Sequence, residues 1–395
     1  MPEATLRDRA KGLLAASGRS DVPPFMVMDV MAAAARIEAA GGHVIHMEVG
    51  QPAAPAPKAA IMAAHAALDG GRIDYTSALG TPSLRARIAR HYRETYGCDV
   101  DAERIVVTTG SSGAFILGFL AMFEPGDRVA VTVPGYPPYR HILTALGCEP
   151  VLIETSSETR HALTGEALLA AHRNTPLKGV LVGSPANPTG TMMSREALTS
   201  LMAAAESAGI RFISDEIYHG LDYAFPAVTA AELSPDALVI NSFSKYFCMT
   251  GWRVGWMVAP EPLVRPIERL QQNLAISVPT LSQIAAEAAF EGRQEMEEVK
   301  RGYLENRRIL IEGLPRAGLT KFLPADGAFY LYADVSAFTS DSFKFAGEML
   351  ERARVAATPG IDFDPVHGRR FIRFSYARSA DEMHEAVARI AQWLG

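Results

Sequence analysis

Short apolar runs rich in β-branched residues recur through the middle of the chain, and most precede a turn and a stretch with helical periodicity. Strands buried on both faces of a parallel sheet have this continuous apolar character, because helices cover both faces. The pattern therefore predicts an α/β unit with a mostly parallel sheet. The predicted strands are residues 104–109, 128–133, 151–154, 180–182, 211–214, 237–241 and 254–258, and the predicted helices between them are 111–123, 139–147, 165–173 and 194–208.

The pattern changes after about residue 280, where longer helical segments alternate with two further strands. A helical pattern at 27–40 is expected to pack with this C-terminal part. The sequence thus predicts a large α/β domain over residues 48–280 and a small, discontinuous α+β domain made of residues 1–47 and 281–395. The C-terminal elements are helices 281–291, 295–314, 341–354 and 380–393 and strands 328–333 and 371–375.

Composition indicates a globular chain long enough for a large core, with 395 residues, 48% of them hydrophobic and 21% charged. Its 38 basic and 44 acidic residues give a net charge of −6, and no run of lysine or arginine stands out. We therefore expect neither nucleic acid nor an anionic membrane as a partner.

Three cysteines without a CxxC pair indicate neither a disulfide framework nor a thiolate zinc site, and no metal site is expected. The first 21 residues mix both charge signs and lack the apolar core of a signal peptide. No stretch reaches the roughly 18 apolar residues of a membrane span. A reducing cytoplasm is the expected location.

Lys245 is the most informative candidate for chemistry, because it follows an apolar strand and precedes Tyr, Phe, Cys and Met. Partial burial disfavours the ammonium form and lowers the pKa, which suits an amine nucleophile or a proton carrier. A lysine at a strand end can equally extend to solvent. The sequence SFSK at 242–245 also fits the S-x-x-K pattern of serine acyl-enzymes, but none of the seven lysines precedes the Thr-Gly that those enzymes need.

Two further strand ends carry polar residues. The prolines and the glycine of SPANPTG at 184–190 fix a rigid loop that presents Asn187. Asp215 and Glu216 end a buried strand, and the phenol of Tyr218 follows three residues after Asp215. Buried adjacent carboxylates are costly unless one faces a cation, so a positively charged ligand atom is one interpretation and a solvated strand end is the other.

An anion site is predicted at the turn TGSSGA, residues 109–114. The N–H groups of a helix start and the hydroxyls of Ser111 and Ser112 would suit a phosphate, although an ordinary serine N-cap has the same pattern. Arg373 lies among the apolar residues of strand 371–375. Such an arginine usually holds a carboxylate of the protein or of a substrate, because its planar fork binds both oxygens.

Nine short motifs follow one another along the chain: GQP at 50–52, YTSALG at 75–80, GSSGA at 110–114, PGYPPY at 134–139, NPTG at 187–190, SDEIY at 214–218, SFSK at 242–245, GWRVGW at 251–256 and RFSYA at 373–377. In this order they resemble the class I/II aminotransferases, which are fold-type I pyridoxal phosphate (PLP) enzymes of the aspartate aminotransferase type. The resemblance runs from about residue 48 to residue 377. It implies a large, mostly parallel seven-stranded sheet between helices, a smaller α+β domain, and transfer of an amino group from an L-amino acid to a 2-oxo acid.

The resemblance also implies a role for each candidate residue. Lys245 would form a Schiff base with PLP and move a proton, and Asp215 would pair with the pyridine nitrogen. Tyr218 and Asn187 would bind the phenolic oxygen of the cofactor. The phosphate would be held by Ser111, Ser112, Ser242 and Arg253, and by Tyr75 from the second subunit of an obligate homodimer with shared active sites. Tyr136 would stack on the ring of the cofactor. The substrate would bind Gly50, Asn187 and Arg373, with its α-carboxylate on Arg373.

The family pattern leaves the substrate side chain open. Asp362 and Asp364, in the loop TPGIDFD at 358–364, could tune the substrate pocket or only face water, and of these two alternatives they are expected to face water. No second arginine for a side-chain carboxylate is evident. An apolar or aromatic side-chain pocket made by Phe25, Tyr136 and Phe363 would suit a neutral or broad range of donors.

Two other reactions use the same scaffold and stay open at this point: β-elimination of the cysteine-conjugate lyase type and cyclopropane-carboxylate synthesis. A transcription regulator built on this fold would need a helix-turn-helix module before the first predicted helix, and only residues 1–26 precede that helix. The regulator is therefore not expected.

Overall fold

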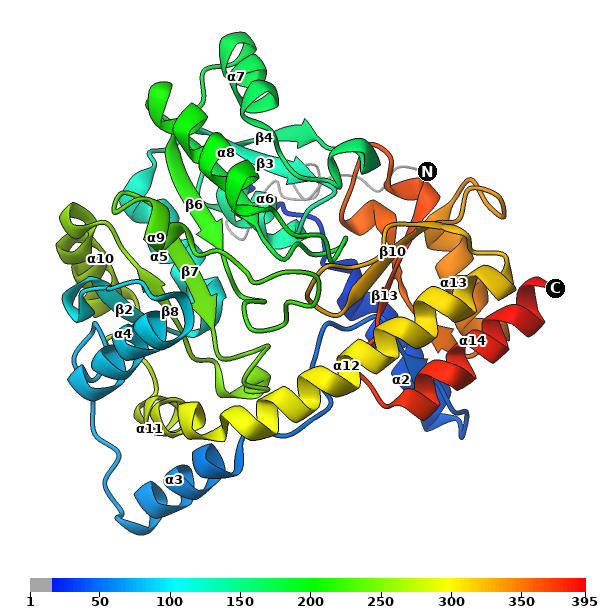
Figure 1. Cartoon of the computed structure of the whole chain (residues 1–395), viewed down its shortest axis with the longest axis horizontal. Coiled ribbons are helices and arrows are strands. Elements are labelled where there is room, and N and C mark those ends of the chain that lie inside the picture. The colour runs from blue at the N-terminus through cyan, green and yellow to red at the C-terminus, as the bar shows by residue number, and fades with distance from the viewer. Residues whose placement is uncertain (1–15) are drawn as a thin grey trace.

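The computed structural model describes residues 16–395 (Figure 1). Most of the segment for which the sequence predicts no signal peptide, residues 1–15, lies outside the described residues. The centre of the fold is a seven-stranded sheet in the order β2-β8-β7-β6-β5-β3-β4. Only β8 runs antiparallel to its neighbours, so the predicted mostly parallel sheet is confirmed. The strands are β2 (Ile105–Thr108), β3 (Arg128–Val133), β4 (Glu149–Glu154), β5 (Gly179–Gly183), β6 (Arg211–Asp215), β7 (Leu238–Ser242) and β8 (Gly255–Val258).

Helices cover both faces of this sheet, which explains why its strands read as continuous apolar runs. Within β2, Ile105 and Val107 belong to one cluster of buried side chains, whereas Val106, which points to the opposite face, belongs to another. The apolar helix α5 packs on β7 and β8. The helices of this part are α4 (Pro82–Tyr96), α5 (Gly110–Met122), α6 (Pro137–Ala145), α7 (Gly165–Asn174), α8 (Arg195–Ser207), α9 (Ala230–Leu233) and α10 (Glu261–Leu274).

A second, antiparallel sheet has the strand order β12-β13-β10-β9 and its own core. Its strands are β9 (Lys321–Phe322), β10 (Tyr330–Asp334), β12 (Thr358–Pro359) and β13 (Phe371–Ser375), and the helices near it are α12 (Arg293–Gly313), α13 (Ser342–Arg352) and α14 (Ala380–Leu394).

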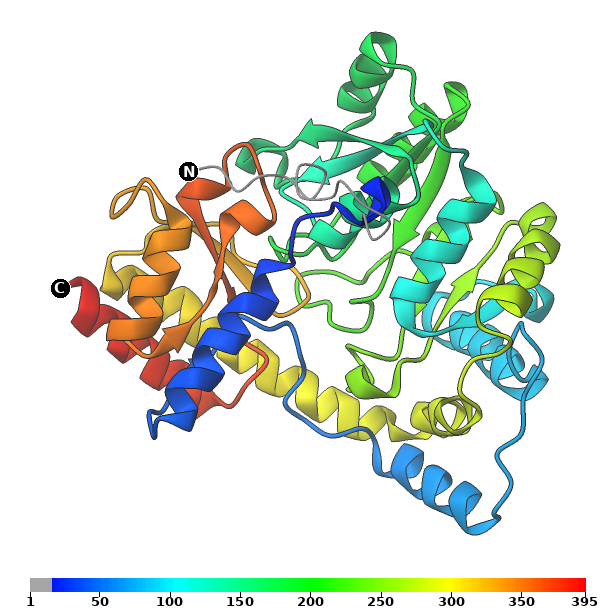
Figure 2. The same cartoon turned by 180° about the vertical axis from the view of Figure 1, so that it is seen from behind.

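The N-terminal part of the chain joins this second sheet region. Strand β1 (Ile45–His46) pairs in parallel with β11 (Val355–Ala356), and α2 (Met26–Ala39) contacts β11 and β12. Figure 2 shows the blue helix α2 lying on the orange and red C-terminal elements, with its first turn directed towards the seven-stranded sheet.

Two further helices complete the fold, one that runs between the two sheet regions and one that projects from the molecule. The long helix α12 runs from the side of the large sheet to the C-terminal elements, where it packs on α14 (Figure 1). Helix α3 (Lys58–Asp69) packs on α11 (Thr280–Ala289) and forms a projecting corner of the molecule. None of the helices in residues 16–395 combines the length and the apolar character needed to cross a membrane.

Candidate active site

A cavity of about 230 Å³ lies where the two sheets meet. Strands β5, β6 and β7 are parallel neighbours, so their carboxyl ends reach the same edge, the usual place for a ligand in such a sheet. These ends supply Asn187, Asp215 and Lys245 to the cavity wall, and the smaller sheet supplies Tyr330 from β10 and Arg373 from β13.

Lys245 directs its amine to the chain segment that leads from β1 to α3. The Nζ atom donates a hydrogen bond of 2.6 Å to the carbonyl oxygen of Gly50. Burial lowers the pKa of Lys245 to about 8, and the nearby guanidinium groups of Arg373 and Arg253 add to this shift. About a tenth of the amine is therefore in the neutral, nucleophilic form at pH 7, far more than for an ordinary lysine.

Asp215 is held in one orientation by two donors. Its Oδ2 atom accepts a hydrogen bond from the hydroxyl of Tyr139, and its Oδ1 atom accepts one of 3.1 Å from the Ile217 N–H. Burial raises the pKa of Asp215 to about 6, against the opposing effect of these hydrogen bonds. The adjacent Glu216 does not line the cavity, because its Oε1 atom accepts hydrogen bonds from the Ser214 hydroxyl and the Ala230 N–H.

Arg373 is only 1% exposed and is fixed from several sides. Its Nη1 atom donates to Asn187 Oδ1 at 2.8 Å, and its Nη2 atom donates to the Glu48 carbonyl oxygen. The guanidinium carbon lies 4.4 Å from the ring centre of Tyr330 and 4.6 Å from that of Phe363. The Nε atom is buried without a hydrogen-bond partner, so the group retains capacity to bind an anion.

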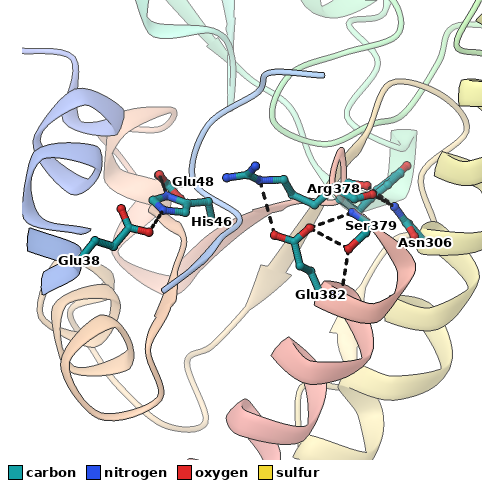
Figure 3. Close-up of polar contacts among 8 residues, drawn as sticks. Glu38, His46, Glu48, Asn306, Arg378, Ser379 and Glu382 are labelled. Atoms are coloured by element: carbon teal, nitrogen blue, oxygen red, sulfur yellow. Dashed lines mark hydrogen bonds and ion pairs between the residues drawn. The ribbon is translucent and has the colours of Figure 1, made fainter. Parts of the chain in front are cut away.

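The backbone that contacts Arg373 is fixed in turn by a small ionic cluster. The Glu48 carboxylate accepts a hydrogen bond of 2.8 Å from His46 Nδ1, and His46 Nε2 lies 3.0 Å from Glu38 Oε1 (Figure 3). The two carboxylates raise the pKa of His46 to about 9, despite its partial burial. A protonated imidazole thus holds Glu48 to α2.

A second cationic region lies at the start of α5, beside Ser111, Ser112 and Ser244. Arg253 donates a hydrogen bond of 2.9 Å to the Thr250 carbonyl oxygen and one of 3.4 Å to the Ser244 hydroxyl. Gly110 has φ +64°, and a Cβ atom there would overlap the guanidinium group of Arg253. Glycine at this position therefore lets the arginine approach the N–H groups at the helix start, which together favour an anion.

The structure brings most of the predicted site residues into one cavity. Tyr218 and Tyr330 join their hydroxyls at 2.8 Å. The ring of Tyr136 makes edge contacts with Phe25 and Tyr139. The predicted residues that line the cavity are Gly50, Ser111, Ser112, Tyr136, Asn187, Asp215, Tyr218, Lys245, Arg253 and Arg373.

Two predicted residues lie elsewhere within this single chain. The buried Ser242 donates its hydroxyl to Ser244 and Val254 and lines a neighbouring cavity. Tyr75 is 80% exposed on the outer surface.

Three residues that the sequence analysis missed also contribute. Ser244 and Tyr139 belong to the motifs SFSK and PGYPPY and could have been found from them, whereas Tyr330 has no signal beyond its place in an apolar strand.

The prediction that Asp362 and Asp364 face water is wrong. They are 2% and 3% exposed, because the loop that carries them folds against α2 and α6. Asp364 Oδ1 accepts hydrogen bonds from the Val366 and His367 N–H groups. Phe363 is buried beneath Arg373 and does not line the cavity, whereas Phe25 and Tyr136 do.

Comparison with known proteins bears on what this arrangement does. The profile of the family described as aminotransferase class I and II matches residues 42–390. The chain belongs to this family. The aminotransferase is 47% identical over 380 residues to the valine–pyruvate aminotransferase of Mycobacterium tuberculosis, a match that covers 95% of this chain and 97% of that relative. It is 32% identical to the aspartate aminotransferase of Pyrococcus horikoshii, with 89% and 90% of the two chains covered.

Solved structures agree with this assignment. A crystal structure of an aminotransferase from Mycobacterium tuberculosis has a TM-score of 0.93 at 47% identity and covers 96% of this chain and 98% of its own. Aspartate aminotransferase from Thermus thermophilus with maleate has a TM-score of 0.90 at 31% identity, with coverage of 97% and 100%.

The enzyme is a transaminase: it moves the amino group of an amino acid to a 2-oxo acid, and enzymes of its family use PLP. All the relatives named here are aminotransferases, so the comparisons support transamination and give no support to β-elimination or cyclopropane-carboxylate synthesis.

Proposed function

We propose that the cavity binds PLP, with Lys245 as the covalent attachment point, and that it transfers the amino group of an aliphatic L-amino acid to a 2-oxo acid such as pyruvate. The observation that carries this proposal is the amine of Lys245, with its pKa of about 8, in one cavity with a buried carboxylate and two arginines. Each of these groups matches a different part of PLP or of an amino acid.

The residues present fit the phosphate of PLP. Arg253, the hydroxyls of Ser111, Ser112 and Ser244, and the N–H groups at the start of α5 offer cationic and hydrogen-bonding partners for a dianion. The absence of a Cβ atom at Gly110 supports this assignment, because it lets Arg253 approach that helix start. Ser242 would act through Ser244, to which its hydroxyl donates at 2.9 Å.

The other end of the cavity fits the ring and the reacting atoms. When bound, PLP supplies a ring that accepts the electron pair released at the substrate Cα. Asp215 would keep a proton on the ring nitrogen, and its orientation by Tyr139 supports this role. Tyr218 and Asn187 would bind the phenolic oxygen, and Tyr136 would lie against the ring. Lys245 would take the proton from the substrate Cα and deliver it to the C4′ atom of PLP.

The substrate is held by its carboxylate and selected by its side chain. Arg373 would bind the α-carboxylate through its planar fork, with Asn187 and the Gly50 backbone beside it. Among the described residues of the cavity wall, the lysines and arginines are Lys245, Arg253 and Arg373, each of which already has a role. The apolar Phe25, Val27, Met28 and Val49 lie nearby.

This wall supports a neutral side chain, and the relative named valine–pyruvate aminotransferase agrees with that choice.

We also infer a homodimer with shared active sites. Large apolar side chains are exposed on and just after α3, on α5 and at the end of α10, and exposed apolar side chains of this kind are typical of an interface between subunits. Tyr75 lies in this group and would reach the phosphate site of the partner. The exposed residues are Met62, Leu68, Ile73, Tyr75, Ile116, Leu120, Leu274 and Ile276.

We further propose that residues 48–280 form a large PLP-binding domain and that residues 1–47 and 281–395 form the small domain. The separate cores of the two sheets support two domains, and Ala285, Ala286, Ala289 and Phe290 from the start of the C-terminal segment pack in the core of the large sheet. A cytoplasmic location is proposed as well, and the three free, buried cysteines are compatible with a reducing compartment.

The experiment that tests the proposal measures L-alanine formed from L-valine and pyruvate by the purified chain with added PLP. We expect steady turnover that needs both substrates, a much lower rate with L-aspartate as donor, and loss of turnover in Lys245→Ala. Absence of alanine with every donor would contradict pyruvate as the acceptor, and a preference for aspartate would contradict the substrate class.

A further inference from the structure

Helix α2 receives its N-terminal cap from a distant part of the chain. The helix begins at Met26, and Phe25 at the N-cap position has no side-chain oxygen to accept a hydrogen bond from the first turn. The Oδ1 atom of Asp362 lies 3.4 Å from the Met26 N–H and accepts its hydrogen bond. A carboxylate at a helix start satisfies free N–H groups and interacts favourably with the helix dipole.

The capped turn forms part of the wall of the active-site cavity. Phe25, Val27 and Met28 all line it, and the ring of Phe25 contacts the edge of the Tyr136 ring at a centroid distance of 6.0 Å. The position of this turn therefore sets the shape of the apolar wall that faces a substrate side chain.

The same short stretch of chain also touches the arginine assigned to the substrate carboxylate. The ring of Phe363, next to Asp362, lies 4.6 Å from the guanidinium carbon of Arg373. The carbonyl oxygen of Asp362 accepts a hydrogen bond from Arg140 of α6, which holds the stretch on the large-sheet side. Asp362 thus connects the first turn of α2 to the backbone beneath Arg373.

We propose that Asp362 is a positioning residue that holds the first turn of α2 over the cavity and thereby sets the affinity for amino acids with larger apolar side chains. This inference rests on the proposed function, because it takes the cavity as the amino-acid site. Asp362 itself does not line the cavity, and it acts through Phe25, Val27 and Met28, which do.

The charged surroundings of Asp362 allow a second test, in which the affinity for a larger donor is measured against pH. The charged groups that face it are Arg140 from α6 and Arg373 from β13, and the N–H groups of α2 approach from the third side. Its Oδ2 atom is buried without a hydrogen-bond partner, and burial raises the pKa of Asp362 to about 6. Protonation below this pH weakens the cap, so affinity for a larger donor falls as the pH falls.

The test compares the KM values for L-valine and L-alanine in holoenzyme variants, with 2-oxobutanoate as the acceptor for both donors, because L-alanine and pyruvate give no net reaction. In Asp362→Ala, we expect the KM for L-valine to rise about five- to tenfold, as for loss of a charged cap, while kcat changes less than about twofold. We expect the KM for L-alanine to change less than about twofold, because a methyl side chain offers little apolar surface to the wall. Asp364→Asn is the matched control, since that buried carboxylate caps only its own loop, and we expect it to behave like the wild type.

Asp362→Asn keeps an oxygen acceptor and cannot titrate, so it tests the charge if Asp362→Ala fails to fold. It should retain most of the affinity for L-valine at pH 8 and lose the rise in KM that the wild type shows below about pH 6. In a double-mutant cycle, Phe25→Ala should make the effect of Asp362→Ala on the KM for L-valine largely disappear.

Equal effects on L-valine and L-alanine, additivity with Phe25→Ala, or an unchanged KM in Asp362→Ala would overturn the inference while the proposed function stands. A wild type without turnover would overturn the proposed function, and this inference with it.

Discussion

The Cα atom of Gly50 faces the hydroxyl of Tyr330 so closely that a Cβ atom at position 50 would overlap that oxygen. The same hydroxyl lies 2.8 Å from that of Tyr218, and the carbonyl oxygen of Gly50 accepts the hydrogen bond from Lys245. One glycine thus lets three groups of the active site meet.

Gly50→Ala should therefore lower kcat/KM at least about tenfold, because the added methyl group displaces either Tyr330 or the backbone that contacts Lys245. Steady-state kinetics with L-valine and pyruvate measure the effect. Adding Tyr330→Phe should recover part of the lost activity, since it removes the overlapping oxygen. A Gly50→Ala enzyme with wild-type kinetics would show that Tyr330 and the backbone at position 50 move apart without loss of function.

Arg373→Ala should reduce kcat/KM for the amino donor at least about 30-fold, because a buried carboxylate loses its charged, bidentate partner. Arg378 is a suitable control: it lies five residues along the chain, and its side chain makes a long ion pair of 4.0 Å with Glu382 (Figure 3). The hydrogen bond that its backbone carbonyl oxygen accepts from Asn306 does not depend on the side chain. Arg378→Ala should keep wild-type kinetics. Equal effects of the two substitutions would remove the special role of Arg373.

The attachment of PLP to the apo chain should accelerate as the pH rises through about 8. The pKa of Lys245 is lowered to about 8, so the neutral amine becomes the major form above this pH, whereas Asp215, with a pKa of about 6, stays ionised. Stopped-flow absorbance after mixing apo chain with PLP at several pH values measures the rate. A rate that keeps rising to the ordinary lysine pKa near 10.5 would argue against the lowered value.

Shared active sites predict complementation between two impaired variants. Lys245→Ala and Tyr75→Ala should each have little activity alone, and co-refolding them should restore up to about a quarter of the wild-type activity. Random pairing makes half of the dimers hybrids, and one site of each hybrid is intact. If activity stays at the sum of the two separate variants, each subunit supplies its whole site.

Several site residues could be predicted because their chemistry contrasts with their surroundings. Lys245 and Asp215 end buried strands, and Arg373 interrupts an apolar one, so each stands out in the sequence. Tyr330 does not, because a tyrosine in an apolar strand is typical of a core. The burial of Asp362 depends on contact with Met26, 336 positions away, and no local pattern contains that information.

The helices and strands likewise divide into those that the sequence predicts and those that it does not. Strand β3 has its predicted bounds, Arg128–Val133, because the buried, β-branched core of a parallel strand stands out in the sequence. Helix α10 was not predicted, and Pro266 within it weakens the helical signal of the sequence. The antiparallel direction of β8 is set by its neighbours β2 and β7, and its own residues read like those of a parallel strand.

Covalent attachment at Lys245 is the central claim, and borohydride reduction of the holoenzyme followed by peptide mass spectrometry tests it most directly. We predict a pyridoxyl phosphate adduct on the peptide that contains Lys245, and its loss in Lys245→Ala. An adduct confined to other lysines, or none on the freshly reduced holoenzyme, would contradict the account.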